Sequence, residues 1–235
     1  MKKLIIIPSR EASTRLPGKP LAKFGGKTLV RHVWEKASAV PNADVCVATD
    51  SEKIRDEVFQ FGGRVEMTDP NIPTGTDRVI AAFDKIGDKS YDCVINLQGD
   101  MPFITPEQVI TSTLPLNHNF EIGCLVYEMV QAEQNNPNSV KAIVSMGEGN
   151  LGRCHWFLRA PLKYGYHHAG IYSFTIPALE KIRKFKQTKF ENFEKLEQLR
   201  FLENGITMGA MLTTAIDGEI NTQEDLDKAI RIYGN

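Results

Sequence analysis

The 235-residue chain has few cysteines, and none of them are paired in a C-x-x-C motif. The four stand far apart, three of them inside apolar runs: Cys46, Cys93, Cys124 and Cys154. This spacing predicts buried, reduced thiols rather than disulfides or zinc ligands. No apolar run approaches the roughly 18 residues of a membrane span, and the apolar stretch after the N-terminal lysines is too short for a signal peptide. We therefore expect a cytoplasmic protein without a membrane partner.

The sequence also lacks an excess of charge of either sign. It has 28 Lys and Arg against 29 Asp and Glu, a net charge of −1, which predicts no nucleic-acid partner. The charge is unevenly distributed, however, because residues 1–36 carry +7 and the remainder carries −8. Positive charge at one end of a nearly neutral protein indicates either a site for a small polyanionic ligand or a solvated basic face.

Short apolar runs alternate with segments of helical period in the first half of the chain. The predicted strands are Leu4–Ile7, Val45–Ala48, Cys93–Leu97 and a weaker one around Val65 and Met67. The predicted helices, each beginning with Ser or Thr as a candidate N-cap, are Thr28–Ala39, Ser51–Phe61 and Thr76–Ile86. This alternation is typical of an α/β protein with a mostly parallel sheet flanked by helices.

The second half has strand-like segments without long helices between them. These are Ile122–Met129, Val140–Ser145 and Gly170–Phe174, and they predict an antiparallel excursion from the sheet. Two further helices are predicted at Phe193–Glu203 and Gln223–Tyr233. Because no linker separates the halves, we expect a single domain over residues 1–235, with an antiparallel arm at about 120–175.

The familiar glycine-rich nucleotide loops are absent. There is no G-x-G-x-x-G, and a Gly-Lys-Thr triplet at 26–28 lacks the first glycine of a P-loop. The loop after the first predicted strand instead combines small residues with three cations, Arg10, Arg15 and Lys19. Small residues let backbone N–H groups approach phosphate oxygens, and the cations neutralise them. Gly18, between two prolines, predicts a rigid turn that aims Lys19, so this loop is a candidate phosphate site.

Polar residues follow three of the predicted parallel strands, where ligands bind in such sheets. They are Pro8-Ser9-Arg10, Thr49-Asp50 and Gln98-Gly99-Asp100. A carboxylate at the end of a strand, beside a phosphate loop, is suited to hold Mg²⁺ bound to a triphosphate. The alternative is that Asp100 merely caps the turn before Met101.

Several motifs in a fixed order give the chain a resemblance to a known family. They are Ile7–Leu21, which matches I-P-[AS]-R-x-x-S-T-R-L-P-x-K-P-L, then Ala48-Thr49-Asp50, Gly62-Gly63, Thr74–Arg78, Gln98–Asp100, His168–Tyr172 and Leu196–Arg200. Together they resemble the 3-deoxy-manno-octulosonate (Kdo) cytidylyltransferase family over essentially the whole chain. The resemblance implies a Rossmann-like nucleotidyltransferase fold, a homodimer, Mg²⁺ as cofactor, and transfer of CMP from CTP to an acidic 3-deoxy sugar for lipopolysaccharide biosynthesis.

The resemblance also implies roles for individual residues. Catalytic roles fall on Arg10, Lys19 and Asp100, and nucleotide binding on Pro8, Ser9, Arg10, Ser13, Arg15, Lys19, Asp50 and Gln98. Sugar binding falls on Arg78, Gln98, Arg159, His168, Glu197 and Gln198, and the metal on Asp100 and Asn221. Taken singly, Arg78 could be a solvated helix residue, His168 a hydrogen-bonded sheet histidine and Glu197 part of a charged helix face.

Two positions depart from the family pattern. Asn221 stands where the family has Asp, and it offers a carbonyl oxygen but no negative charge. We therefore expect weaker Mg²⁺ affinity than in Asn221→Asp. Leu158 stands where the family usually has Ser before the arginine. The alternatives are an enzyme similar to CMP-sialic acid synthetase, or a degenerate, non-catalytic protein that binds nucleotide sugars.

Overall fold

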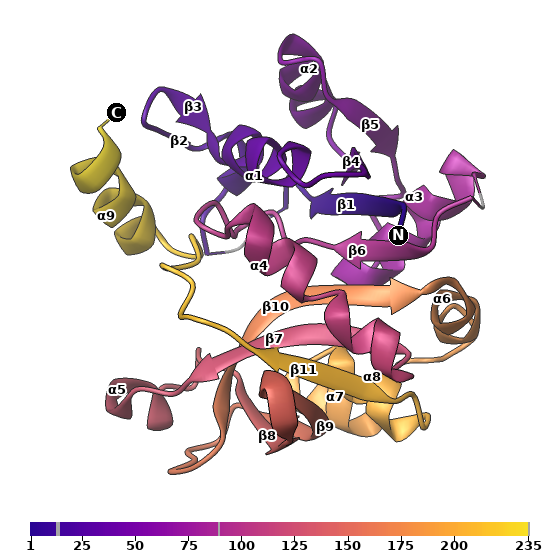
Figure 1. Ribbon diagram of the computed structural model, residues 1–235. Coiled ribbons are helices and arrows are strands. Elements are labelled where there is room, and N and C mark those ends of the chain that lie inside the picture. Colours follow the sequence, from indigo (N-terminus) through magenta and orange to yellow (C-terminus); the bar gives the residue numbers. More distant parts are fainter. Residues whose placement is uncertain (13–14, 89, 235) are drawn as a thin grey trace. The chain divides into compact units, whose positions relative to one another are not determined.

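A computed structural model describes residues 1–12, 15–88 and 90–234. The chain divides into two compact units, one made of Met1–Val109 with Ile216–Asn235 and the other of Ile110–Ala215. Each is an α/β arrangement of strands and helices (Figure 1). The expectation of a single domain over 1–235 stays a prediction.

The first unit is built on four parallel strands. β1 (Lys3–Ser9) lies between β4 (Ala43–Thr49) and β6 (Cys93–Asn96), and β4 also pairs with β5 (Arg64–Met67). All four strands predicted for this half are confirmed. Leu4 to Ile7 have no solvent exposure, so β1 is the centre of the core. Parallel strands bury both faces, which is why they read as continuous apolar runs.

Helices connect these strands and pack on them. They are α1 (Leu29–Ser38), α2 (Glu52–Gln60) and α3 (Gly75–Ile86), with the C-terminal α9 (Gln223–Tyr233) in the same unit. A short 3₁₀ helix, η1 (Lys19–Leu21), precedes a small hairpin of β2 (Lys23–Phe24) and β3 (Lys27–Thr28). All four predicted helices of this unit are confirmed to within a residue or so.

The predicted N-caps are only partly right. Thr28 and Ser51 occupy N-cap positions, but their hydroxyls donate to Glu57 (2.8 Å) and Glu11 (2.6 Å) instead of capping. α3 begins earlier than predicted, because Thr74 rather than Thr76 accepts from the Asp77 backbone N–H. The Glu11 bond matters for the site, since it ties the loop after β1 to the start of α2.

The second unit contains five strands. β7 (Ile122–Glu128) pairs antiparallel with β10 (Tyr166–Thr175) and parallel with β11 (Met208–Leu212). β9 (Leu151–Leu158) pairs antiparallel with β11 and with β8 (Lys141–Met146), and β8 returns to pair with β10. The five strands therefore close into a ring, an arrangement like a small barrel. The strands predicted at β7, β8 and β10 are confirmed, whereas β9 and β11 were not predicted.

The remaining elements are short. They are α4 (Pro106–Thr111), at the chain boundary between the units, and η2 (Leu114–His118), α5 (Gln131–Gln134), η3 (Glu148–Asn150), α6 (Ile176–Ile182), α7 (Lys189–Glu194) and α8 (Gln198–Glu203). The single helix predicted at Phe193–Glu203 is wrong, because α7 and α8 replace it. Lys195 takes a left-handed φ of 57° between them, while Arg200 pairs with buried Glu191 at 3.2 Å. The tertiary ion pair thus favours two short helices over one long one.

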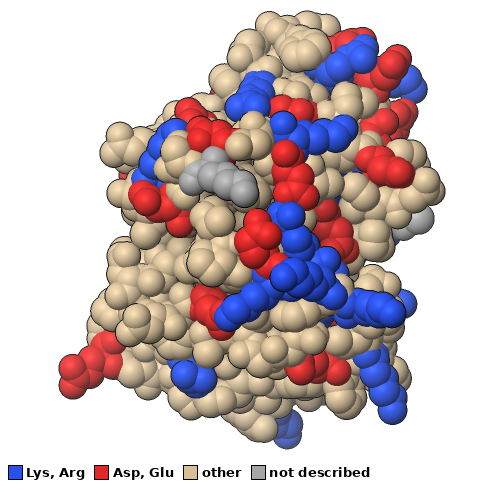
Figure 2. Space-filling view, turned by 90° about the vertical axis from the view of Figure 1, so that its right-hand side faces the viewer, with Lys and Arg blue, Asp and Glu red and all other residues tan. Residues whose placement is uncertain are grey.

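All four cysteines are buried and free, as predicted. Burial raises the pKa of Cys46 to about 12 and that of Cys93 to about 11. On the face shown in Figure 2, acidic and basic side chains are interspersed, in keeping with the net charge of −1. No helix among the described residues is both long and apolar enough to span a membrane.

Candidate active site

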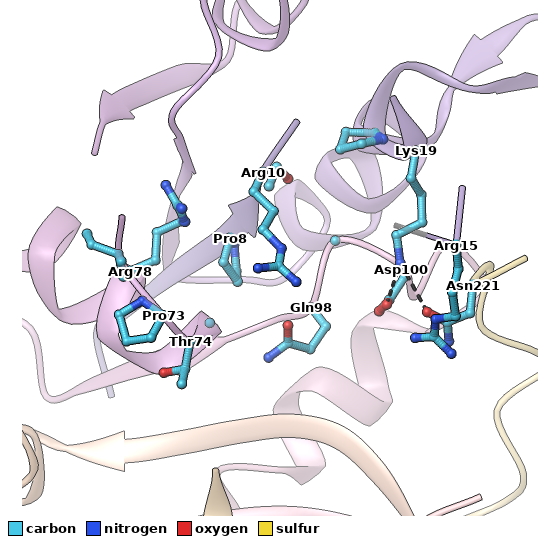
Figure 3. A pocket seen from close by; sticks show the side chains of 15 residues that line it. Pro8, Arg10, Arg15, Lys19, Pro73, Thr74, Arg78, Gln98, Asp100 and Asn221 are labelled. Atoms are coloured by element: carbon cyan, nitrogen blue, oxygen red, sulfur yellow. Dashed lines mark hydrogen bonds and ion pairs between the residues drawn. The ribbon is translucent and has the colours of Figure 1, made fainter. Parts of the chain in front are cut away.

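A cavity of about 250 Å³ lies in the first unit, at the carboxyl ends of β1 and β6 (Figure 3). Its lining comes from three loops and one residue before α9. The residues are Pro8 and Ser9 at the end of β1, Arg10, Arg15, Lys19 and Pro20 after it, Ile72, Pro73, Thr74, Gly75 and Arg78 around the start of α3, Gln98, Gly99 and Asp100 after β6, and Asn221. The sequence placed the site at these strand ends, and the structure brings two of the three predicted loops to it.

Lys19 is held by the turn that the sequence predicted. Gly18 has a left-handed φ of 66°, a conformation that glycine adopts readily. The Leu16 carbonyl accepts from Lys19 N at 3.1 Å, and Pro20 is buried behind the turn. The backbone is thereby fixed so that the lysine side chain extends into the cavity (Figure 3).

Lys19 joins the two predicted metal ligands. Its Nζ donates to Asp100 Oδ2 at 2.9 Å and to Asn221 Oδ1 at 3.1 Å. Asp100 comes from the end of β6, and Asn221 from the segment before α9, more than a hundred residues later. The Asp100 carboxylate therefore lines the cavity and accepts from Lys19. The alternative, an aspartate that only caps the turn before Met101, does not describe this contact.

Asn221 is placed by the start of α9. Thr222 and Asp225 form a capping box there, and the Asp225 carboxylate accepts from the backbone N–H of Asn221 at 3.1 Å. The adjacent Ile220 N–H donates to the backbone carbonyl of Asp100 at 3.0 Å. These bonds fix both the helix terminus and its distance from Asp100.

A further carboxylate, that of Glu219, adjoins this group. Glu219 Oε2 accepts from Asn221 Nδ2 at 2.9 Å. Desolvation of its carboxyl group, followed by the charge of Asp100, raises the pKa of Glu219 to about 7. Lys19 and Arg15 act in the opposite direction, so positive and negative groups alternate across this end of the cavity.

The cavity is also suited to an anion. Arg10 and Arg15 are exposed, and among the described residues neither has an ion-pair partner. Ser9 Oγ is buried without a hydrogen-bond partner in the described part of the chain. A Cβ on Gly99 would lie 2.9 Å from that oxygen and 3.0 Å from the Pro8 carbonyl, so only glycine fits against this loop. Free cations and an unsatisfied hydroxyl are what a phosphate-bearing ligand would engage.

Arg78 is buried, so the alternative of a solvated helix residue is wrong. Its Nη2 donates to Asp50 Oδ2 at 3.1 Å, and Nη1 donates to the Thr68 hydroxyl. Asp50 also accepts from the backbone N–H of Glu11 at 3.1 Å, and it is not among the lining residues described. The Arg78 guanidinium is therefore paired on the protein side, while Gln98 donates to Asn96 Oδ1 at 3.1 Å.

The other predicted sugar-binding residues lie in the second unit. His168 is buried on β10, and its Nε2 has no hydrogen-bond partner among the described residues, so the alternative of a satisfied sheet histidine fails at this atom. Burial, and secondarily His167, lower the pKa of His168 to about 3, so its ring is neutral at physiological pH. His168 can therefore exchange hydrogen bonds with a ligand but cannot supply a positive charge.

Two neighbours complete this picture. Tyr172 lies with its ring centroid 5.4 Å from that of His168, and its hydroxyl donates to Gln198 Oε1 at 3.0 Å. Sequence reasoning missed Tyr172, although the motif His168–Tyr172 contains it.

Glu197 is the N-cap residue of α8, and Arg159 Nε donates to the Glu194 carbonyl at 3.2 Å. Ser13, predicted to bind nucleotide, lies outside the described residues.

The oxygens of Asp100 and Asn221 fit a magnesium ion. Both accept from one cationic group, so both already face a positive charge. No group of three His, Cys, Asp or Glu side chains arranged for a metal occurs among the described residues. Mg²⁺ does not need one, because it commonly binds one or two protein oxygens together with substrate phosphates and water.

Comparison with known proteins gives one family. The model of the family described as "Cytidylyltransferase" matches residues 4–208. A 3-deoxy-manno-octulosonate cytidylyltransferase of Rhodopseudomonas palustris is 39% identical over 98% of this chain and 97% of its own. An 8-amino-3,8-dideoxy-manno-octulosonate cytidylyltransferase of a Shewanella species is 38% identical over 97% of each chain.

Solved structures agree. That of CMP:2-keto-3-deoxy-manno-octonic acid synthetase complexed with CTP has a TM-score of 0.89 and 32% identity, covering 99% of this chain and 98% of that one. A cytidylyltransferase from Leptospira borgpetersenii, with a TM-score of 0.63 and 21% identity over 96% of this chain and 83% of that chain, shares the fold. The α/β fold, the cationic cavity at the strand ends and these relatives define a nucleotidyltransferase enzyme. Within that class, the chain belongs to the cytidylyltransferase family.

Proposed function

We propose that this enzyme transfers CMP from CTP to Kdo or a close acidic 3-deoxy sugar and releases pyrophosphate. The anomeric hydroxyl oxygen of the sugar forms a bond to the α-phosphorus and loses its proton to water. The bond between the α-phosphorus and the α,β-bridging oxygen breaks, and pyrophosphate leaves with that electron pair. The observation that carries the proposal is the convergence of Lys19 on Asp100 and Asn221 beside a cavity with free arginines.

The residues of the cavity would have different roles, and these roles follow from their charges. Arg10, Arg15 and Lys19 would bind phosphate oxygens and stabilise the charge that develops on them, the term that usually dominates such catalysis. Pro8, Ser9, Ser13, Asp50 and Gln98 would complete the nucleotide site. Asp50 would act from behind the cavity, through the Glu11 backbone and Arg78.

Asp100 and Asn221 would hold Mg²⁺ through their oxygens. When bound, Mg²⁺ supplies neutralisation of phosphate charge and orientation of the leaving group. Lys19, which donates to both of these oxygens, would bind phosphate oxygens of CTP when Asp100 and Asn221 hold Mg²⁺.

The sugar would be recognised by Arg78, Gln98, Arg159, His168, Glu197 and Gln198. Because His168 is neutral, the carboxylate of the sugar would be met by arginine, and His168 would bond to hydroxyl groups. The 38% identity to an 8-amino-3,8-dideoxy-manno-octulosonate cytidylyltransferase favours the 8-amino sugar as a second candidate. The resemblance further supports a cytoplasmic homodimer in lipopolysaccharide biosynthesis, and a Rossmann-like, mostly parallel sheet with an antiparallel excursion.

A pyrophosphate-release assay with CTP and Mg²⁺ tests the proposal. Kdo, 8-amino-Kdo and N-acetylneuraminate are offered separately, and we expect release with one of the first two. Release with N-acetylneuraminate alone would favour the sialic acid alternative. CTP binding without release from any sugar would favour the non-catalytic one.

Lys19→Ala tests the residue roles in the same assay. We expect turnover to fall at least tenfold because the α-phosphate loses a positive charge, which corresponds to about 1.4 kcal/mol or more of transition-state stabilisation. Lys23→Ala removes an exposed lysine of the same loop region and should leave turnover unchanged. Normal turnover in correctly folded Lys19→Ala would contradict the role.

A further inference from the structure

The amide of Asn221 is held at both ends. Oδ1 accepts from Lys19 Nζ at 3.1 Å, and Nδ2 donates to Glu219 Oε2 at 2.9 Å. An amide presents an acceptor at one end and a donor at the other, so its orientation decides whether it can face a cation. With its oxygen toward Lys19 and Asp100, the amide can bind a cation. If the amide were turned by 180°, it would present N–H groups to a positive charge.

An aspartate at this position would have no such problem, because both ends of a carboxylate accept. The family resemblance implies Asp at this position, where this chain has Asn221. A partner that accepts only, on the far side of the amide, is therefore needed to select one orientation. A carboxylate that is ionised is such a partner, and at a pH well above 7 Glu219 places one at the nitrogen end, where its Oε2 accepts from the amide.

The backbone fixes this pairing. Glu219 follows a tight turn in which Gly218 N–H donates to the Ile216 carbonyl at 2.8 Å. Ile220, between Glu219 and Asn221, is bound to the Asp100 backbone. The Glu219–Asn221 pair is thus anchored to the same strand end that carries the Asp100 carboxylate.

We infer that Glu219 is a positioning residue of the metal site, which holds the Asn221 carbonyl oxygen toward the cation and so offsets the Asn-for-Asp departure. Outer groups that orient a ligand in this way commonly change metal affinity 10–100-fold when they are removed. The inference rests on the proposed use of Mg²⁺–CTP. It predicts that the importance of Glu219 depends on which residue occupies position 221.

The test measures Mg²⁺ affinity of the enzyme–CTP complex by calorimetry at pH 8.5, where the Glu219 carboxyl group is ionised, and without sugar, so that no turnover occurs. Glu219→Gln keeps the size of the side chain but can both donate and accept, so it no longer selects the amide orientation. We expect about tenfold weaker Mg²⁺ binding. Glu224→Gln, an exposed carboxylate in the first turn of α9 paired with Lys228 at 2.9 Å, removes the same charge and should leave the affinity unchanged.

The double variant gives the sharper result. In Asn221→Asp, the new carboxylate needs no orienting partner and would face Glu219 at the distance where a hydrogen bond now lies. Adding Glu219→Gln should therefore leave Mg²⁺ affinity equal or tighten it, the reverse of its effect on the natural sequence. The inference is overturned if Glu219→Gln matches the natural protein, or if it weakens binding equally in both backgrounds.

The same measurement separates the inference from the proposed function. A natural protein that binds no CTP, or binds Mg²⁺ no better with CTP than without it, would contradict the proposed function itself. A natural protein that shows CTP-dependent Mg²⁺ binding, with Glu219→Gln unaffected and folded by circular dichroism, would contradict only the role of Glu219.

Discussion

At the scale of single residues, burial decides what an ionisable group can do. Arg78 and Asp50 form an ion pair with little exposure to solvent, so removing either side chain would leave the charge of the other uncompensated. Lys19 is partly exposed and donates to two side-chain oxygens that are suited to bind a metal. His168 is buried without a charged partner and is kept neutral. Residue type alone did not distinguish these three situations.

The buried His168 makes stability depend on pH. Its pKa is about 3 in the folded protein, against about 6.5 in the unfolded chain, so only the unfolded state binds the proton between these values. Stability is therefore lost as pH falls below about 6.5 and continues to fall toward pH 3. At pH 5 this residue alone should cost about 2 kcal/mol relative to neutral pH.

Urea unfolding of the natural protein and of His168→Gln at pH 7 and pH 5 checks this. The variant should lose less stability between the two pH values, by about 2 kcal/mol. His118→Gln, at an exposed position, should keep the pH dependence of the natural protein. Equal losses in all three proteins would show that His168 takes up its proton while folded.

At the scale of elements, helix starts position the site. The capping box of Thr222 and Asp225 starts α9 and holds the backbone of Asn221. A second capping box, of Thr188 and Glu191, starts α7 in the other unit, away from the metal ligands in sequence. The two caps are chemically alike, but only one carries a residue of the cavity.

Thr222→Ala and Thr188→Ala form a matched pair for this point. Each should lower the free energy of unfolding by about 1 kcal/mol, the usual cost of losing a threonine cap. Only Thr222→Ala should also weaken CTP-dependent Mg²⁺ binding, because it loosens Asn221. Urea unfolding and calorimetry give the two readouts, and an equal effect of both variants on Mg²⁺ would contradict a local role for the α9 cap.

At the scale of the whole molecule, the net charge of −1 conceals a local concentration of positive charge. Arg10, Arg15 and Lys19 line one cavity, whereas Figure 2 shows a face on which both signs are mixed. The second unit exposes apolar side chains as well, with 81% of Phe193 and 66% of Tyr164 open to solvent in the single chain. Contact with a second copy of the chain would bury these side chains.

We expect the protein to be a homodimer in solution. The exposed apolar side chains of the second unit give a second copy something to bury, and the family resemblance implies the same state. Sedimentation equilibrium should give a mass twice that of one chain. A mass equal to one chain at micromolar concentration would exclude the dimer.

From the amino-acid sequence alone, the main strands and helices of the first unit and many of the residues that line the cavity could be predicted. Continuous apolar runs specified β1, β4 and β6 because parallel strands are buried on both faces, and the positions after them became the site. Gly18 and the nearby cations predicted the Lys19 loop because a left-handed turn and charge are local properties. The motif order predicted the cytidylyltransferase family.

Features that depend on residues distant in the sequence could not be predicted from local patterns. The ring of β7 to β11 needs pairings that no local pattern encodes, and the break at Lys195 accompanies an ion pair between neighbouring helices. The pairing of Arg78 with Asp50 and the orientation of the Asn221 amide likewise follow from groups brought together by folding. Strands and turns follow from local propensity, and charge follows from residue type, so both can be predicted from the sequence. The partner of each side chain depends on burial and on long-range hydrogen bonds, which only the folded chain establishes.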